Sequence, residues 1–525
     1  MLSLDIIRRL RAYHAGYPIP FGETKRYYVA DDAQILAIAF VRMGGESRPW
    51  AIAFGRPDRE PRVVTVPEAR NRDLVAEMAL ELAPVLLQQL QCPSHCKSNL
   101  TEWGDLPPLR QLWLPNDTHL DMLHHLAFAY TWTKHSGVDQ KTLNALGRAC
   151  GWLFRESQRP GQQVVLLATQ VLRELFTFPT ETVRQNHLGY LLAWLEGRGG
   201  YEARLAAATE AEQYSTSTSL DPQVEREVLE PLVEAWGQAE KKGTSAPAKQ
   251  AKRKIAAALE LEVTRRWLLV QRAIQVVRKD KRIANAGLDE LVKEALKEQW
   301  YQYNRVELNL DDPDNGPAFV PSVETDRHPA AAASRYLVHQ ASAELLEGLL
   351  VHNDRELLAN AIAAGDAFRG KIISVRDEGE GRVTTPIWRI SDPADRQLRL
   401  RAGSVVEAVG FKRRQGVIRA IDDAVGGGFE IEIELTNCKT NRNPGPGIHA
   451  QPPTERSLRN KVVAFVASSG EGISRRKASR VWNKDGPGAW LTHGRPGAGH
   501  VVTEDDRDDA AVVEASLQRA GGSSE

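Results

Sequence analysis

One uninterrupted apolar stripe between about residues 249 and 281 constrains this chain more than any other feature. Its members recur at intervals of three and four residues, the repeat of one face of an α-helix. They are Ile255, Leu259, Val263, Trp267, Val270, Ile274 and Val277. Before it, Asp221 and Pro222 form a helix-start signal for a helix to about Glu240, which Pro231 should kink. The pair predicts an antiparallel helical hairpin or short coiled coil.

The length of 525 residues leaves room for several domains, and the 42% apolar and 26% charged composition is that of a globular protein. We predict a multidomain α+β fold. The expected parts are an N-terminal αβββα-like domain, a mostly helical middle with the basic helical hairpin, and a C-terminal small β-barrel. Their boundaries are 1–100 for the α+β domain, 101–215 for a helical domain, 216–305 for the hairpin, 306–345 for a linker and short helix, 346–440 for the barrel, and 441–525 for a basic segment with an acidic mobile tail.

The first residues predict an amphipathic helix rather than a signal peptide, because the apolar patch is short and arginines follow it directly. Leu4, Ile7, Leu10 and Tyr13 fall on one face. The chain has no run of 18 apolar residues, so we expect no transmembrane helix and no membrane partner. Four cysteines give no disulfide framework, which favours a cytoplasmic protein.

The N-terminal strands carry the first resemblance. The segments "AQILAIAFVRM", "RPWAIAFG" and "PRVVTVP" predict strands, and a helix follows from about Arg70 to Gln91. This order of helix, three strands and helix resembles the core of the restriction-endonuclease-like nucleases. Those enzymes hold a metal and activate water with an acidic residue and an acid-x-Lys pair on the central strands. The segments "ILAIAFV" and "PWAIAF" hold no carboxylate and no lysine, so we expect a structural domain.

A late β-rich unit predicts the barrel. Five strands can be drawn in "GKIISVRDE", "RVTTPIWRI", "LRLRAGSVVEAVG", "QGVIRAIDD" and "GFEIEIELT". Short strands in succession without helices favour a small closed barrel from about Gly370 to Asn437. We expect five inward-facing side chains: Ile372, Ile387, Val405, Val417 and Ile431.

This unit resembles the SH3-like, KOW-like and OB-like barrels, such as those inserted in superfamily 1 helicases, which ride on nucleic acid. Those helicases carry a phosphate-binding loop of the form G-x-x-x-x-G-K-[ST]. Here "GRPGAGHV" has His500 in place of the lysine and Val501 in place of the hydroxyl residue. Because those two residues engage phosphate and Mg²⁺, we expect no ATP hydrolysis and no cofactor.

Charge is unevenly distributed, although lysine plus arginine and aspartate plus glutamate both number 68. Residues 241–282 hold thirteen basic and three acidic residues, and residues 437–480 hold nine basic and two acidic ones. Clustered cations beside a small barrel are what phosphate-backbone binding needs. The predicted nucleic-acid-binding residues are Lys249, Lys252, Arg253, Lys254, Arg265, Arg266, Lys412, Arg413, Arg414, Arg475, Arg476, Lys477 and Arg480. The alternative is a solvated face, or one that pairs with acidic groups of the same chain.

A histidine and cysteine region is the remaining chemical candidate. Cys92, His95 and Cys96 lie close together, and His119, His124 and His125 follow about 25 residues on. A single C-x₃-C without a second pair favours reduced structural cysteines, so no metal site is assigned.

The function these features favour is a non-catalytic, cytoplasmic nucleic-acid-binding accessory protein. It would contact the DNA or RNA phosphate backbone and work with a separate motor or nuclease subunit, for instance in genome defence or nucleic-acid processing. Two alternatives stay open. One is a protein–protein scaffold without nucleic-acid contact, and the other is an unrecognised enzyme that uses the region 92–125.

Overall fold

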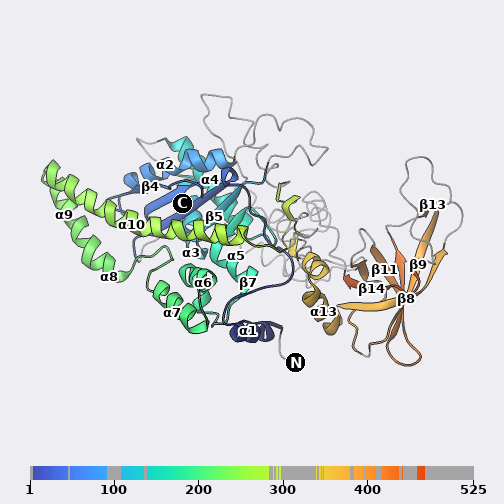
Figure 1. The fold of residues 1–525 in the computed structure, drawn as a ribbon. Helices are drawn as coiled ribbons and strands as arrows, with labels where there is room; N and C mark the ends of the chain where they lie inside the picture. The colour runs from blue at the N-terminus through green and yellow to red at the C-terminus, as the bar shows by residue number, and fades with distance from the viewer. Residues whose placement is uncertain are drawn as a thin grey trace, which may run out of the picture. The chain divides into compact units, whose positions relative to one another are not determined.

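The computed structural model (Figure 1) is of mixed α+β class. It describes residues 4–44, 48–90, 108–134, 139–282, 348–378, 383–394, 396–409, 415–436, 440–441 and 458–467, with isolated residues between 288 and 346. The predicted linker between 306 and 345 therefore lies almost wholly outside the described residues, as does the predicted tail after residue 467.

A five-stranded mixed sheet organises the N-terminal part. Its strands are β2 (Ile35–Arg42), β3 (Pro49–Gly55), β4 (Arg62–Thr65), β5 (Gln111–Leu114) and β6 (Val165–Leu167). Their order is β4-β3-β2-β5-β6. The first three strands form an antiparallel meander, and β5 and β6 add in parallel to β2 and to each other. The predicted order of helix, three strands and helix is confirmed.

Helices cover both faces of this sheet, which explains its uniformly apolar strands. Seven of the eight residues of β2 are buried, so both of its faces are covered, a pattern typical of a central strand. Helix α2 (Arg72–Leu90) packs against β3 and β4. Helices α3 (Asp117–Tyr130), α4 (Gln140–Ser157) and α5 (Ala168–Leu175) complete the covering layers.

The predicted boundary at residue 100 does not separate two bodies. Strands β5 and β6 lie in the segment that the sequence assigns to a helical domain, yet both extend the N-terminal sheet. One hydrophobic core runs from Ala30 to Ala295. The segments "QLWL" and "VLL" are too short for periodicity to separate a buried strand from a buried helix, which is why the sequence missed them.

The helical hairpin is observed. After a short helix, α8 (Pro222–Val224), and a π-helical turn (Glu225–Leu229), α9 spans Glu230–Lys241 and α10 spans Ser245–Arg278. Every member of the predicted stripe on α10 is buried. Pro231 directly follows the π-helical turn in a continuous right-handed helix, and the wider hydrogen-bond spacing of that turn accommodates its missing amide proton. Helix α10 packs against α9 and crosses the sheet over β2, β3 and β4 (Figure 1).

Three further helices and one small two-stranded ladder complete the N-terminal part. They are α1 (Leu4–Ala15), α6 (Leu188–Glu196) and α7 (Tyr201–Glu212), with a small ladder of β1 (Ile19–Pro20) and β7 (Phe176–Thr177). The expected apolar face of α1 is not buried: Leu10 is 48% and Tyr13 is 55% exposed. Arg8 and Ala12 are buried instead. The Arg8 guanidinium lies over the Phe21 ring, 3.7 Å from its centre, and this cation–π contact makes its burial favourable.

The late β-unit is a closed antiparallel barrel. It is preceded by α13 (Arg355–Ala364), which Asp354 caps by accepting backbone hydrogen bonds. Its strands are β8 (Ala367–Glu378), β9 (Val383–Asp392), β10 (Val405–Ala408), β11 (Gln415–Asp423), β12 (Phe429–Leu435) and β14 (Val462–Ala467), with a short β13 (Thr440–Asn441) on β9. The order β12-β11-β10-β14-β8-β9 closes through the pairing of β12 with β9.

Two details of the barrel prediction are wrong. The barrel has six main strands rather than five, because β14 closes it between β10 and β8 beyond the expected end at Asn437. Ile372, Ile387 and Ile431 are buried as expected. Val405 is 43% exposed and pairs with Val417 on the outer face, while their neighbours Val406 and Ile418 point inward. Neighbouring side chains on a strand point to opposite faces, so a register error of one residue exchanges inside and outside.

No helix in the described part of the chain is both long and apolar enough to cross a membrane.

Candidate nucleic-acid interface

Six cations gather where α9 turns into α10, and we call them the hairpin tip. They are Lys241, Lys242, Lys249, Lys252, Arg253 and Lys254, and all six are exposed. Within the described residues, none of them makes an ion pair. Unpaired and hydrated cations keep their full charge for an external anion.

The turn between the helices explains why these charges lie together. Gly243 has φ +64°, a left-handed conformation that glycine adopts without strain. The Thr244 amide then donates to the carbonyl oxygen of Ala239, 2.9 Å away, which closes the end of α9. The turn sends α10 back along α9, so cations at the end of one helix lie next to those at the start of the other.

One face of α10 carries the tip, and another packs on the protein. Lys249, Lys252 and Arg253 are three and four residues apart and lie on the same side of the helix. The alanine at 251 and Ile255 are buried against the rest of the protein. The tip is therefore a solvated cationic surface held on a rigid helix.

Arg266, one of the predicted phosphate ligands, is buried and has a structural role. Its exposed fraction is 0%, and its guanidinium donates to the carbonyl oxygens of Ser217 (2.6 Å) and Ser219 (3.1 Å). It also donates to the Glu262 carboxylate at 2.8 Å. Burial lowers the pKa of Arg266 and the Glu262 carboxylate opposes that shift. No surface of this side chain is left for a phosphate.

The other cations of the second half of α10 pair within the chain. Arg265 binds Glu262 at 2.6 Å and lies over the Tyr214 ring, 4.7 Å from its centre. Arg272 pairs with Glu196, and Arg278 pairs with Asp32 at 2.6 Å. In this half of the helix the cations therefore pair with acidic groups of the same chain, which was the alternative to phosphate binding. The phosphate-binding hypothesis remains for the hairpin tip.

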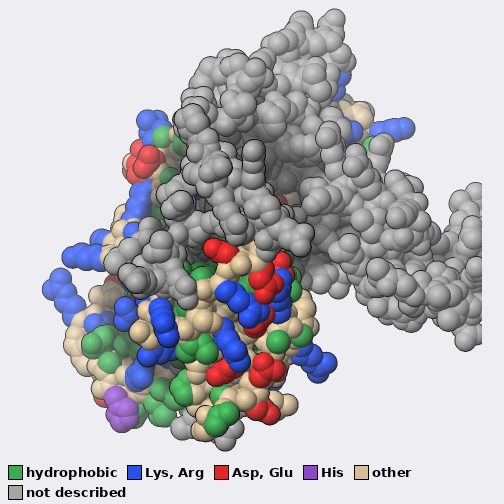
Figure 2. Space-filling model, turned by 90° about the vertical axis from the view of Figure 1, so that its right-hand side faces the viewer, with side chains coloured by type: hydrophobic (Ala, Val, Ile, Leu, Met, Phe, Trp, Pro, Cys, Tyr) green, Lys and Arg blue, Asp and Glu red, His purple; other side chains and the backbone are tan. Residues whose placement is uncertain are grey.

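Three arginines on the barrel strands pair with glutamates of the same barrel. Arg376 pairs with Glu432 at 2.8 Å, and Arg389 pairs with Glu430 at 2.6 Å. Arg419 bridges Glu434 and Glu378, and its hydrogen bond holds the pKa of the Glu378 carboxyl below its usual range. Figure 2 shows basic and acidic side chains interleaved on the described surface of one face. These pairs neutralise part of the charge on β8, β9, β11 and β12, while Arg369 and Lys371 of β8 are exposed.

Several predicted ligands cannot be placed. Lys412, Arg413, Arg414, Arg475, Arg476, Lys477 and Arg480 lie outside the described residues, as do His500 and Val501. Lys241 and Lys242 belong to the basic segment 241–282 but are not among the predicted nucleic-acid-binding residues. Both lysines follow directly after Glu240, the predicted end of the first hairpin helix. This position in the sequence could have identified them as part of the hairpin tip.

Of the described histidines in this region, His119 is built into the core, whereas His124 is exposed and His125 is half-buried. His119 is 0% exposed, its Nδ1 accepts the Phe40 amide at 3.0 Å, and its Nε2 lies 3.2 Å from the Thr216 carbonyl oxygen. Burial, with a smaller effect of Arg266, lowers its pKa to about 3. His124 stacks on Phe154. Within the described residues, no three histidine, cysteine or acidic side chains gather as a metal site; Cys92, His95 and Cys96 lie outside them.

Comparisons were made with protein-family models, with curated proteins and with solved structures, and none of the three found a match.

Proposed function

We propose that this protein binds the phosphate backbone of DNA or RNA through the hairpin tip, as a non-catalytic accessory protein. The observation that carries the proposal is the contrast along α10. The four arginines in the second half of α10 have partners within the chain, whereas the six cations of the hairpin tip have none among the described residues. Cations that are exposed, clustered and unpaired are the groups that replace condensed counterions on a phosphate backbone.

The tip favours contacts to phosphates over contacts to bases. Residues 229–260 are all described, and no large hydrophobic side chain among them is exposed. Base stacking needs exposed aromatic rings, which this segment does not present. We therefore expect weak dependence on sequence.

The cellular setting is part of the same proposal. The sequence resemblance of the barrel to the SH3-like, KOW-like and OB-like barrels supports this setting, in which a partner motor or nuclease would supply the chemistry. A cytoplasmic complex for genome defence or nucleic-acid processing fits these features. Loss of a partner's activity on nucleic acid when the tip is neutralised would support that setting.

A matched pair of variants tests the proposal. Lys252→Gln, Arg253→Gln and Lys254→Gln together remove three tip charges. The control, Arg376→Gln, Arg389→Gln and Arg419→Gln, removes three charges from the paired surface of the barrel. Fluorescence anisotropy with a labelled duplex at low salt should show weaker binding for the tip variant and nearly unchanged binding for the control.

The scaffold alternative is decided by the same measurement. If the wild-type protein binds no oligonucleotide at low salt, the tip serves an acidic protein surface instead. Equal loss of binding in both variants would mean that only net charge matters and would remove the tip's special role.

A further inference from the structure

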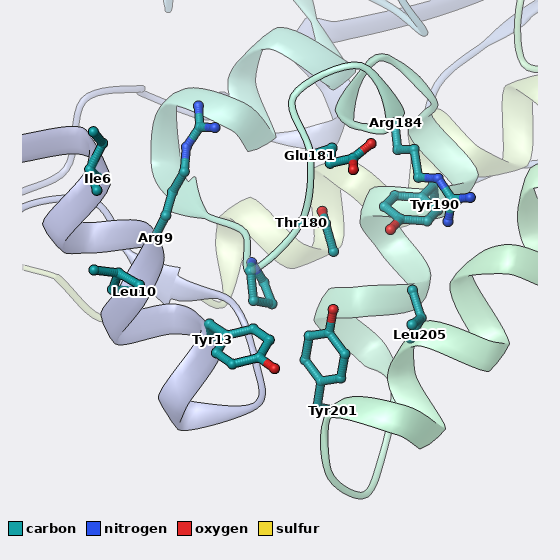
Figure 3. A pocket seen from close by; sticks show the side chains of 11 residues that line it. Ile6, Arg9, Leu10, Tyr13, Thr180, Glu181, Arg184, Tyr190, Tyr201 and Leu205 are labelled. Atoms are coloured by element: carbon teal, nitrogen blue, oxygen red, sulfur yellow. The ribbon is translucent and has the colours of Figure 1, made fainter.

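A second feature, on separate residues, is a pocket between α1 and the helices α6 and α7 (Figure 3). Its volume is about 600 Å³, within the usual range for small-molecule sites. It is lined by Ile6, Arg9, Leu10, Tyr13, Pro179, Thr180, Glu181, Arg184, Tyr190, Tyr201 and Leu205. The side of α1 that we expected to be buried thus forms one wall of this pocket.

Two aromatic rings of the pocket wall, Tyr13 and Tyr201, pack against each other, and Tyr201 also packs on the fully buried Trp194 behind the wall. Tyr13 and Tyr201 meet edge to face with ring centres 5.1 Å apart, and Tyr201 lies 5.4 Å from Trp194. The 55% exposed Tyr13 leaves much of its surface open at the rim. An open aromatic face of this kind suits a flat, unsaturated ring.

A buried hydroxyl without a well-aligned hydrogen bond lies at the floor. Tyr190 is 0% exposed, and its hydroxyl makes no well-aligned hydrogen bond in the described structure, where the Arg184 guanidinium is the charged group that interacts with it. In Figure 3 this hydroxyl points toward the space between Thr180 and Tyr201. Buried hydroxyls are normally satisfied, so each exception calls for an explanation. The Arg184 guanidinium lies over the Tyr190 ring, 6.0 Å from its centre, and the half-exposed arginine side chain can move aside.

Charged groups complete the pocket. Arg9 pairs with Asp5 at 3.1 Å, and Arg184 pairs with Glu212 at 3.9 Å, both at the surface. Such exposed pairs contribute little to stability, so an anionic ligand can compete for either arginine. Glu181, a carboxylate, adds an acceptor for an amino group on the same ligand.

We propose that this pocket binds a nucleotide. The base lies against Tyr13 and Tyr201, its amino edge meets Glu181, and its phosphate draws Arg184 away from Tyr190, which exposes the tyrosine hydroxyl to the ligand. Arg9 contacts the phosphate from the α1 side. The same chemistry is offered by a free mononucleotide and by the 5′-phosphorylated end of a single strand.

Isothermal titration calorimetry on the full chain tests the site with AMP, adenosine and inorganic phosphate. AMP should bind more tightly than either fragment. Arg184→Gln should weaken AMP binding about tenfold or more, because it removes a charged hydrogen bond. Tyr190→Phe, which removes one oxygen and keeps the ring, should weaken it about three- to tenfold. The matched control is Arg198→Gln, since Arg198 is exposed and does not line the pocket.

A second titration, with a 5′-phosphorylated trinucleotide, distinguishes a free mononucleotide from the end of a nucleic-acid strand as the ligand. Binding of the trinucleotide but not of AMP, with the same loss in both variants, assigns the site to a strand end. The proposal fails if neither ligand binds, if phosphate alone binds as tightly as AMP, or if the two variants bind like the control. Variants of the hairpin tip retain the pocket, so failure of one proposal is distinguishable from failure of the other.

Discussion

The indole Nε1 of Trp267 donates a hydrogen bond to the backbone carbonyl oxygen of Ala37, 3.0 Å away, and thereby joins α10 to the central strand β2. Both residues are fully buried. Trp267→Phe removes this hydrogen bond and part of the ring volume, and leaves the carbonyl without that donor. We expect it to lower the free energy of unfolding by about 2–4 kcal/mol. Urea denaturation measures the change, and a loss below about 0.5 kcal/mol would contradict this anchoring.

Arg266 should matter for stability and not for binding. Arg266→Met deprives the backbone carbonyl oxygens of Ser217 and Ser219 of a charged donor and leaves Glu262 with Arg265 alone, which should cost about 2–5 kcal/mol. Arg253→Met, on the exposed tip, should stay within about 0.5 kcal/mol of wild type. Urea denaturation of the two variants compares these costs, and equal stability would show that Arg266 is not structural.

His119 should make stability depend on pH in a defined direction. The unfolded chain binds a proton on this histidine below its ordinary pKa of 6.5, whereas the folded chain does so only near pH 3. Its contribution is therefore complete above pH 6.5 and is lost as the pH falls from there toward 3. Between pH 6 and 4, wild type should lose about 1.4 kcal/mol per pH unit more than His119→Gln. Parallel curves from denaturation at several pH values would contradict this assignment.

Two adjacent residues on β11 test which side chains of this strand face the interior of the barrel. Ile418 is buried, whereas Val417 on the same strand is only partly buried. Ile418→Ala should cost about 2–5 kcal/mol. Val417→Ala should cost much less, because its side chain keeps contact with solvent. Scanning calorimetry of the barrel transition distinguishes them, and the reverse order would restore the register expected from the sequence.

Long periodic patterns could be predicted from the sequence, and short ones could not. The stripe on α10 spans many turns, and each of its members from Ile255 to Val277 is buried. β10 has only four residues, and the adjacent valines 405 and 406 give no signal for which one faces inward. Strand β14 lies beyond the expected end of the barrel, so its pairing with β8 and β10 depends on contacts distant in sequence.

The charges of the candidate interface could also be predicted only in part from the sequence. Composition located the basic segment, but it could not separate Arg266 from Lys254, because both are cations on one helix. Their difference arises from the serine carbonyls that only the folded chain brings to Arg266. The pocket was missed for a similar reason, since its walls come from residues 6–13 and 179–205.

The salt dependence of oligonucleotide binding tests the central claim most directly. The logarithm of the association constant should fall linearly with the logarithm of salt concentration, with a slope of about 0.9 per phosphate contact on a duplex. Removing Lys252, Arg253 and Lys254 by substitution with Gln should therefore reduce that slope by about 2–3, if all three contact phosphates. The barrel variant with three substituted arginines should keep the wild-type slope. A tip variant that also keeps it would show that the hairpin tip does not contact nucleic acid.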